Sequence, residues 1–130
     1  MILLDTDVCI ALLRGHRKVV ERRRHTTEPA AIAGMTVAEL FYGAEKSARP
    51  VENHSLVESF LLTLPILHTT LPILRLFGQL KAQIERGGHP LPDADILIAA
   101  TALKHGTRLI TGNTSYFNRI PELKLDNWLL

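Results

Sequence analysis

Short, wholly apolar runs alternate along this chain with stretches of helical periodicity, and this alternation constrains the fold more than any other feature. Ile2–Leu4 is apolar and ends at an aspartate, and a second run, Ala30–Met35, follows a proline. Three further short segments that contain apolar residues, 66–68, 107–111 and 124–125, are also expected to form strands. Strands that are apolar on both faces are typical of a parallel sheet buried between helices. The sequence therefore predicts an α/β fold, a three-layer sandwich with a mainly parallel central sheet.

Helical patterns occupy the intervals between these runs. We expect helices over residues 8–14, from there through a basic segment to about 25, and then over 37–46, 52–64, 73–86 and 93–105. Pro92 precedes the last of these helices and Gly106 follows it, as is usual at helix limits. No linker, internal repeat or low-complexity tract divides the 130 residues, so a single domain over 1–130 is expected.

Composition narrows the class of protein. Hydrophobic residues make up 46% of the chain and charged residues 22%, which excludes a disordered polypeptide. The one cysteine, Cys9, allows no intrachain disulfide and fits a core position in a reducing compartment. No basic leader precedes the first apolar run, and prolines interrupt the longest uncharged stretch, 59–74. We therefore expect a cytoplasmic protein with neither a secretory signal nor a membrane span.

Acidic residues follow the predicted strands. Asp5 ends the first run, Glu39 lies one helical turn past the second, and Asp95 lies in the first turn of the last long helix. In open parallel sheets, ligands bind beyond the carboxyl ends of the strands, so these carboxylates are expected to share one edge. Grouped carboxylates repel one another unless a cation lies among them. Oxygen ligands favour Mg²⁺ or Mn²⁺ over Zn²⁺, and such a site is suited to phosphoryl chemistry.

Local structure offers other roles for some of these residues. Asp93 fits a helix N-cap, and we assign it to capping and Asp95 to chemistry, because residues two apart on a helix point in different directions. Thr36 and Glu39 also match a capping box. Asp7, two positions after Asp5, could belong to the same acidic group or could equally be the N-cap of the first helix. Asp5, at the end of an apolar strand, has few structural duties and is the strongest candidate.

A basic cluster lies early in the chain. Six of the 15 lysines and arginines fall between positions 14 and 24, namely Arg14, Arg17, Lys18, Arg22, Arg23 and Arg24. Such a cluster is typical of contacts with a phosphate backbone, although a solvated helix face is the alternative. Aromatic residues make up only 5% of the chain, which disfavours recognition by base stacking.

Four segments, in order, resemble the PIN-domain family and specifically its VapC-type toxin branch. They are Met1–Asp7, Thr36–Lys46, Asp95–Leu103 and Leu109–Phe117, and the closing residues 120–128 also resemble the tail of these toxins. The resemblance implies a PIN-like fold and an endoribonuclease, dependent on Mg²⁺ or Mn²⁺, in which water attacks an RNA phosphodiester in line. It also implies a homodimer inhibited by a cognate VapB-type antitoxin.

The resemblance assigns roles to individual residues. The family's acidic positions fall on Asp5, Glu39 and Asp95, with Asp5 and Asp95 as metal ligands and Glu39 orienting water. Supporting positions fall on Thr6, Asp93, Thr111 and Asn113. Many family members carry a fourth acid in the loop after the late strand, where this chain has Asn113. An amide supplies no charge, so the resemblance here implies one tightly held metal rather than two.

Three other functions remain open from the sequence. The Asp5–Thr6–Asp7 order also occurs in haloacid-dehalogenase-like phosphatases, although Cys9 stands where their motif has threonine. A receiver domain has similar length, but no aspartate follows the third predicted strand. A catalytically silent PIN-like binding module is consistent with Asn113. Metal-dependent cleavage of RNA distinguishes the nuclease from all three.

Overall fold

A parallel five-stranded sheet forms the centre of the computed structural model, which describes residues 1–130. Its strands are β1 (Ile2–Leu4), β2 (Ala30–Ala33), β3 (Ile66–Leu67), β4 (Arg108–Ile110) and β5 (Leu125–Asp126). They lie in the order β3-β2-β1-β4-β5, and every neighbouring pair is parallel. The predicted α/β fold with a parallel sheet is confirmed.

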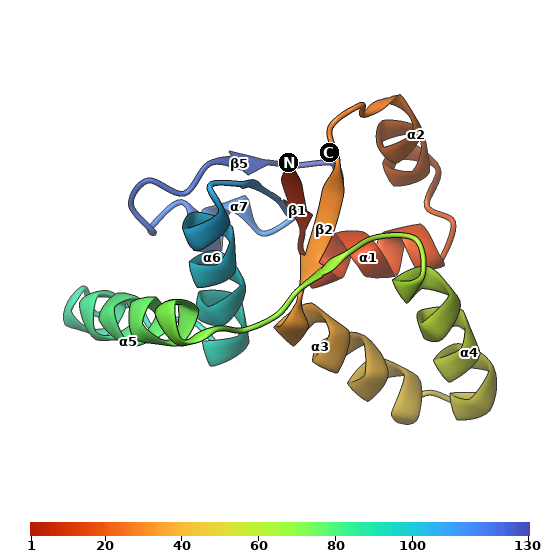
Figure 1. Ribbon diagram of the computed structural model, residues 1–130, viewed down its shortest axis with the longest axis horizontal. Coiled ribbons are helices and arrows are strands. Elements are labelled where there is room, and N and C mark those ends of the chain that lie inside the picture. The colour runs from red at the N-terminus through yellow and green to blue at the C-terminus, as the bar shows by residue number, and fades with distance from the viewer.

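Seven helices surround the sheet (Figure 1). They are α1 (Thr6–Leu13), α2 (Arg17–His25), α3 (Gly34–Glu45), α4 (Pro50–Leu61), α5 (Leu71–Arg86), α6 (Asp93–His105) and α7 (Thr114–Phe117). All six expected helices are present, and α7 is an addition that is too short to show a helical period. None of the helices has the length and apolarity needed to cross a membrane.

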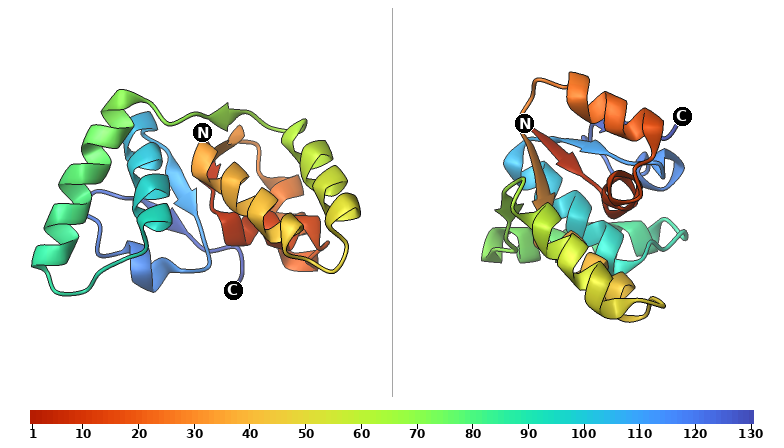
Figure 2. Two further views of the ribbon diagram at one scale, coloured as in Figure 1. Left: turned by 90° about the horizontal axis from the view of Figure 1, so that it is seen from below. Right: turned by 90° about the vertical axis from the view of Figure 1, so that its right-hand side faces the viewer.

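Side chains that alternate along β1 fill two separate cores. Leu3 packs on one face of the sheet with residues of α5 and α6, such as Ile73 and Ile98. Ile2 and Leu4 pack on the other face with residues of α1, α3 and α4. Figures 1 and 2 show these two groups of helices on opposite sides of the strands. Because both faces are covered, the three strands β1, β2 and β3 are apolar throughout, whereas Arg108 begins β4 and Asp126 ends β5.

The order of strands in the sheet changes direction at β1. From β1 the chain adds β2 and β3 on one side, and it then returns to place β4 and β5 on the other side. Such a switch point leaves a crevice at the carboxyl ends of the central strands, where α/β proteins bind their ligands. Asp5 follows β1 and Thr111 follows β4, so both lie at this point.

Candidate functional site

Asp5 lies between the end of β1 and the start of α1. Its Oδ1 accepts a 2.8 Å hydrogen bond from the Thr6 backbone N–H, and its Oδ2 accepts a 2.7 Å bond from the Thr111 hydroxyl. The residue is 3% exposed. Burial, followed by the charge of Asp7, raises the pKa of Asp5 to about 7 in spite of these two bonds. Asp5, rather than Asp7, is the N-cap of α1.

Thr6 joins the start of α1 to α3. Its hydroxyl donates a 2.6 Å hydrogen bond to Oε1 of Glu39, and its oxygen also lies 3.2 Å from Oγ1 of Thr36. The N-cap of α3 is Ala33, and no side chain caps this helix. The capping box of Thr36 and Glu39 that the sequence allowed is therefore wrong. Glu39 instead points to the end of β1, held there by a residue 33 positions earlier.

Asp95 completes the predicted group of acids from the first turn of α6. It is half-buried, and burial raises the pKa of its carboxyl, with further contributions from the charges of Glu39 and Asp7. The charge of Asp95 in turn adds to the upward shift of the Asp5 pKa. The structure thus brings Asp5, Glu39 and Asp95 together from three separate elements.

Asp7 also lies in this group, whereas the sequence left it between the acids at the strand ends and a cap of the first helix. Its Oδ2 accepts a 2.8 Å hydrogen bond from the Gly112 N–H, whereas its Oδ1 is buried without a hydrogen-bond partner. Burial raises the pKa of Asp7 as well. The available signal was the Asp5–Thr6–Asp7 spacing directly after a strand, which places both carboxylates at the start of α1, at the edge of the sheet.

Asp93 has a different place from the one predicted. The N-cap of α6 is Pro92, no side chain caps the helix, and the Asp93 carboxylate pairs with Lys81 Nζ of α5 at 3.0 Å. Its hydrogen bond and its charge raise the pKa of Lys81. The charge of Asp93 does not contribute to the raised pKa values of Asp5, Asp7 and Asp95. The assignment to capping is wrong, because an ion pair with the neighbouring helix takes this carboxylate.

The loop after β4 contributes one side chain and two backbone groups. The Thr111 hydroxyl, which is buried, donates to Asp5 and accepts a 3.0 Å bond from the Asn113 N–H. The Asn113 side chain is exposed. In this loop Asn113 therefore acts through its backbone, which orients Thr111.

The chemistry of the donors fits a hard divalent cation. All the charged groups at the site are carboxylates, three of them have raised pKa values, and one buried oxygen of Asp7 lacks a partner. No group of three or more His, Cys, Asp or Glu side chains converges closely enough to form a complete cage of protein ligands. Mg²⁺ typically takes one or two carboxylates and keeps several waters, so an open set of carboxylates suits it.

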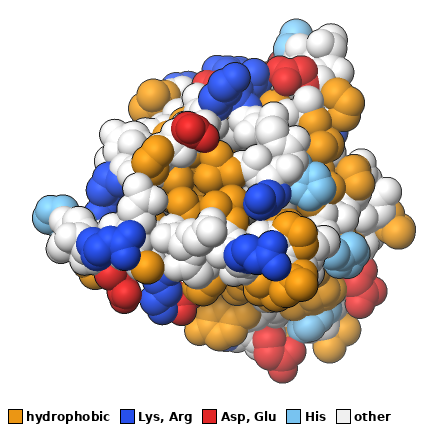
Figure 3. Space-filling model, turned by 60° about the vertical axis from the view of Figure 1, so that its left-hand side comes forward, with side chains coloured by type: hydrophobic (Ala, Val, Ile, Leu, Met, Phe, Trp, Pro, Cys, Tyr) orange, Lys and Arg blue, Asp and Glu red, His pale blue; other side chains and the backbone are white.

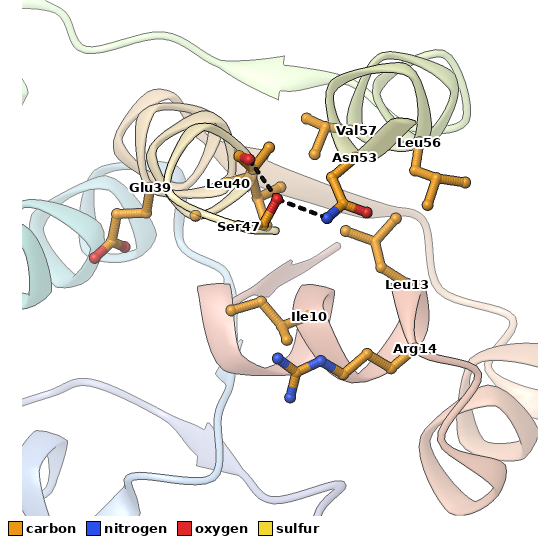
Figure 4. Close-up of a pocket in the computed structure, with 11 residues that line it drawn as sticks. Ile10, Leu13, Arg14, Glu39, Leu40, Ser47, Asn53, Leu56 and Val57 are labelled. Atoms are coloured by element: carbon orange, nitrogen blue, oxygen red, sulfur yellow. Dashed lines mark hydrogen bonds between the residues drawn. The ribbon is translucent and has the colours of Figure 1, made fainter. Parts of the chain in front are cut away.

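A groove between α1, α3 and α4 ends at Glu39. Apolar side chains line it, among them Ile10, Leu40 and Leu56. Figure 4 shows Arg14 along one side of the groove and Glu39 at one end of it. A 2.8 Å hydrogen bond from Asn53 to Ser47 joins α4 to the chain just beyond α3. One end of an apolar surface thus adjoins the acidic site.

The basic cluster divides into engaged and free side chains. Arg22 pairs with Asp126 at 3.1 Å, and its guanidinium lies 5.8 Å from the centre of the Trp128 ring. Arg24 lies 3.5 Å from Glu21. Arg17 and Lys18 make no ion pair and line a shallow hollow beside Trp128. Arg23 is likewise outside any ion pair, and Arg14 belongs to the groove described above.

Comparison with known proteins identifies relatives over nearly the whole chain. The PIN domain family model matches residues 2–123. Ribonuclease VapC2 of Haemophilus influenzae is 34% identical over 128 residues, which cover 98% of this chain and 97% of the relative. The tRNA(fMet)-specific endonuclease VapC of Salmonella typhimurium is 34% identical over 127 residues, 97% of this chain and 96% of the relative.

A solved structure agrees in fold. In the crystal structure of VapBC2 from Rickettsia felis bound to a DNA fragment from their promoter, one chain superposes on this one with a TM-score of 0.91. The two chains are 31% identical, and the match covers 98% of this chain and 99% of the other. These matches exclude the phosphatase and receiver-domain alternatives, which belong to other families.

Proposed function

Because the chain belongs to the PIN-domain family, in its VapC branch, we propose that it is a metal-dependent endoribonuclease and the toxin of a type II toxin–antitoxin pair. The observation that carries the proposal is the gathering of Asp5, Glu39 and Asp95 at the switch point of the sheet. Relatives that align over almost the full chain are named ribonuclease and endonuclease, which supports RNA as the substrate.

In the proposed reaction, Asp5 and Asp95 hold Mg²⁺ or Mn²⁺. When bound, such an ion lowers the pKa of water and neutralises charge on a phosphate. Glu39 accepts a hydrogen bond from Thr6 at Oε1, which leaves Oε2 to orient the attacking water. Thr111 fixes the Asp5 carboxylate by its hydrogen bond to Oδ2. Attack by water rather than by the ribose 2′-hydroxyl leaves a 5′-phosphate and a 3′-hydroxyl.

In this proposal the RNA backbone runs along α2. Arg17, Lys18 and Arg23 are the side chains available for phosphates, because Arg22 is committed to Asp126 and Trp128. Arg24 is weakly engaged by an exposed carboxylate and adds to the same positive surface. Figure 1 shows α2 above α1, near the two ends of the chain.

Two protein partners are part of the proposal. A VapB-type antitoxin would occupy the groove between α1, α3 and α4. Glu39 lines this groove, so a protein bound there would contact the proposed catalytic site and could inhibit it. A second copy of the chain would pack on the α5 side, where Leu71 and Leu74 are exposed. Figure 3 shows hydrophobic side chains gathered at the centre of this face, with lysines and arginines around them. An RNA substrate and an antitoxin partner both favour a cytoplasmic location.

The test uses purified full-length chain and a mixture of RNAs. We expect endonucleolytic cleavage with Mg²⁺ or Mn²⁺, none in EDTA, and none from Asp5→Asn at a matched concentration of folded protein. Mapping the ends distinguishes 5′-phosphates from 5′-hydroxyls. Full activity of Asp5→Asn or in EDTA contradicts the proposed chemistry, whereas metal binding without cleavage favours the silent binding module. Growth arrest on expression, relieved by the product of the neighbouring reading frame, tests the role as a toxin.

A further inference from the structure

The chemistry proposed above leaves the Asp7 side chain without a role. One of its oxygens is satisfied by Gly112, but Oδ1 is buried and has no hydrogen-bond partner. A buried carboxylate oxygen without a partner destabilises the folded chain. A cation bound at the site would remove this cost, so the unpartnered oxygen points to a ligand.

Gly112 fixes which oxygen of Asp7 remains available. Its N–H donates to Oδ2 at 2.8 Å, and a Cβ at position 112 would lie 2.8 Å from the same oxygen and would overlap Leu129. A larger residue at position 112 would therefore force the side chains of Leu129 and Asp7 to move. The carboxylate is therefore held from one side, and Oδ1 is left for a different partner.

We propose that Asp7 is a further ligand of the divalent cation, through Oδ1, alongside Asp5 and Asp95. This inference rests on the proposed function. Both oxygens of Asp5 already accept a hydrogen bond, which leaves each with less capacity for a cation, whereas Oδ1 of Asp7 accepts none. Asp7 also supplies a negative charge at an edge where the loop after β4 offers only Asn113.

A purely structural role for Asp7 predicts a different result for one substitution. If Asp7 only joins α1 to the loop after β4, then Asp7→Asn keeps the acceptor for the Gly112 N–H and changes little. If Asp7 binds the cation, then the same variant loses a charged ligand. Because the Gly112 N–H keeps its acceptor and no charged oxygen is left buried without a partner, the metal-free variant is at least as stable as the wild type.

The experiment is a calorimetric titration of Mn²⁺ into purified, EDTA-stripped full chain. We expect Asp7→Asn to weaken Mn²⁺ binding at least about tenfold, which is the lower end of the losses seen at metal sites. Its melting temperature in EDTA stays equal to or above that of the wild type. Asp7→Ser, which is shorter and uncharged, gives the same loss if the asparagine variant folds poorly. Glu122→Gln removes one exposed charge before β5, at the opposite edge of the sheet, and keeps the wild-type affinity within about twofold.

The outcomes separate this inference from the proposed function. Wild-type Mn²⁺ affinity in Asp7→Asn, together with metal-dependent RNA cleavage by the wild type, overturns the role of Asp7 and leaves the nuclease intact. A wild type that neither binds Mn²⁺ nor cleaves RNA overturns both.

Discussion

The Thr111 hydroxyl donates a 2.7 Å hydrogen bond to Oδ2 of Asp5, from a residue 106 positions away in the chain. Thr111 is the only residue whose side chain lowers the pKa of Asp5, and the other contribution of this kind is the Thr6 backbone N–H. The bond therefore supports the ionised form of an acid that burial would otherwise keep protonated.

We expect Thr111→Val to lower the free energy of unfolding by about 1–3 kcal/mol at pH 8, because it removes a buried hydrogen bond to a charged group. The loss is smaller at pH 5, where Asp5 is protonated. Urea unfolding in EDTA at the two pH values measures the difference. Thr101→Val is the control, since its hydroxyl donates to a carbonyl within α6 and the loss has no pH dependence. An equal loss at both pH values in Thr111→Val contradicts the argument.

The raised pKa of Asp5 predicts how metal-free stability varies with pH. Between about pH 4 and pH 7, Asp5 holds its proton in the folded chain but not in the unfolded chain, so the free energy of unfolding falls as pH rises through this range. A shift from 3.8 to about 7 corresponds to about 4 kcal/mol. We expect Asp5→Asn to become the more stable protein above pH 7, by about 1–3 kcal/mol after the loss of one hydrogen bond.

Denaturant unfolding of wild type and Asp5→Asn from pH 4.5 to pH 8, in EDTA, gives the comparison. The difference between the two proteins should grow with pH and level off above about pH 7. A difference that is constant over this range would mean that Asp5 ionises normally in the folded chain.

Thr6 holds Glu39 in place through a hydrogen bond. Substituting Thr6 therefore changes the position of the Glu39 carboxylate without removing its charge. We expect Thr6→Val to lower the rate of RNA cleavage about 10- to 100-fold, as is common when a partner of a metal-site residue is removed. Thr6→Ser keeps the hydroxyl and should retain most of the activity. Cleavage rates under single-turnover conditions provide the measurement. Wild-type rates in Thr6→Val would show that Glu39 does not depend on Thr6 for its position.

The basic surface of α2 predicts salt-dependent binding of RNA. Reversing both Arg17 and Lys18 to glutamate should weaken the binding of RNA to an Asp5→Asn background. It should also flatten the dependence of log Kd on log salt by about one unit for each phosphate that the variant no longer neutralises. The matched control reverses Lys104 and Lys124, two exposed lysines that form no ion pair. Equal weakening by both pairs of substitutions would indicate a non-specific effect of net charge.

The groove beside Glu39 predicts where the antitoxin binds. Leu56, on α4, lines the groove and is 54% exposed, whereas Val51 lies on the same helix outside it and is 81% exposed. We expect Leu56→Glu to abolish the relief of growth arrest by the co-expressed neighbouring frame, while Val51→Glu leaves it unchanged. Copurification of the two proteins gives an independent readout. Relief that persists in Leu56→Glu places the antitoxin elsewhere.

The apolar runs predicted the sheet and most helices because burial on both faces leaves a pattern within a few residues. The same reasoning selected Asp5, since an acid that ends such a run is conspicuous in the sequence. The roles of side chains that pair with residues far away in the sequence were harder to predict. Asp93 satisfied a local capping rule, but Lys81 on another helix takes its carboxylate.

Asp7 and Arg22 show the same difficulty. The place of Asp7 depends on Gly112, and that of Arg22 depends on Asp126, each more than one hundred positions away. Spacing along the chain carries no information about such pairs. The sequence therefore predicted which residue types gather at the edge of the sheet but not which of them are already engaged.

The position of β4 also bears on when the acidic edge comes into being. β4 is made fourth but lies beside β1, and the residues just after it supply the bonds to Asp5 and Asp7. Asp95 belongs to the helix that immediately precedes it. A chain still on the ribosome, with only β1, β2 and β3 emerged, lacks both the late acid and these two bonds. The acidic site therefore stays incomplete through most of translation, because its last members come from the final third of the chain.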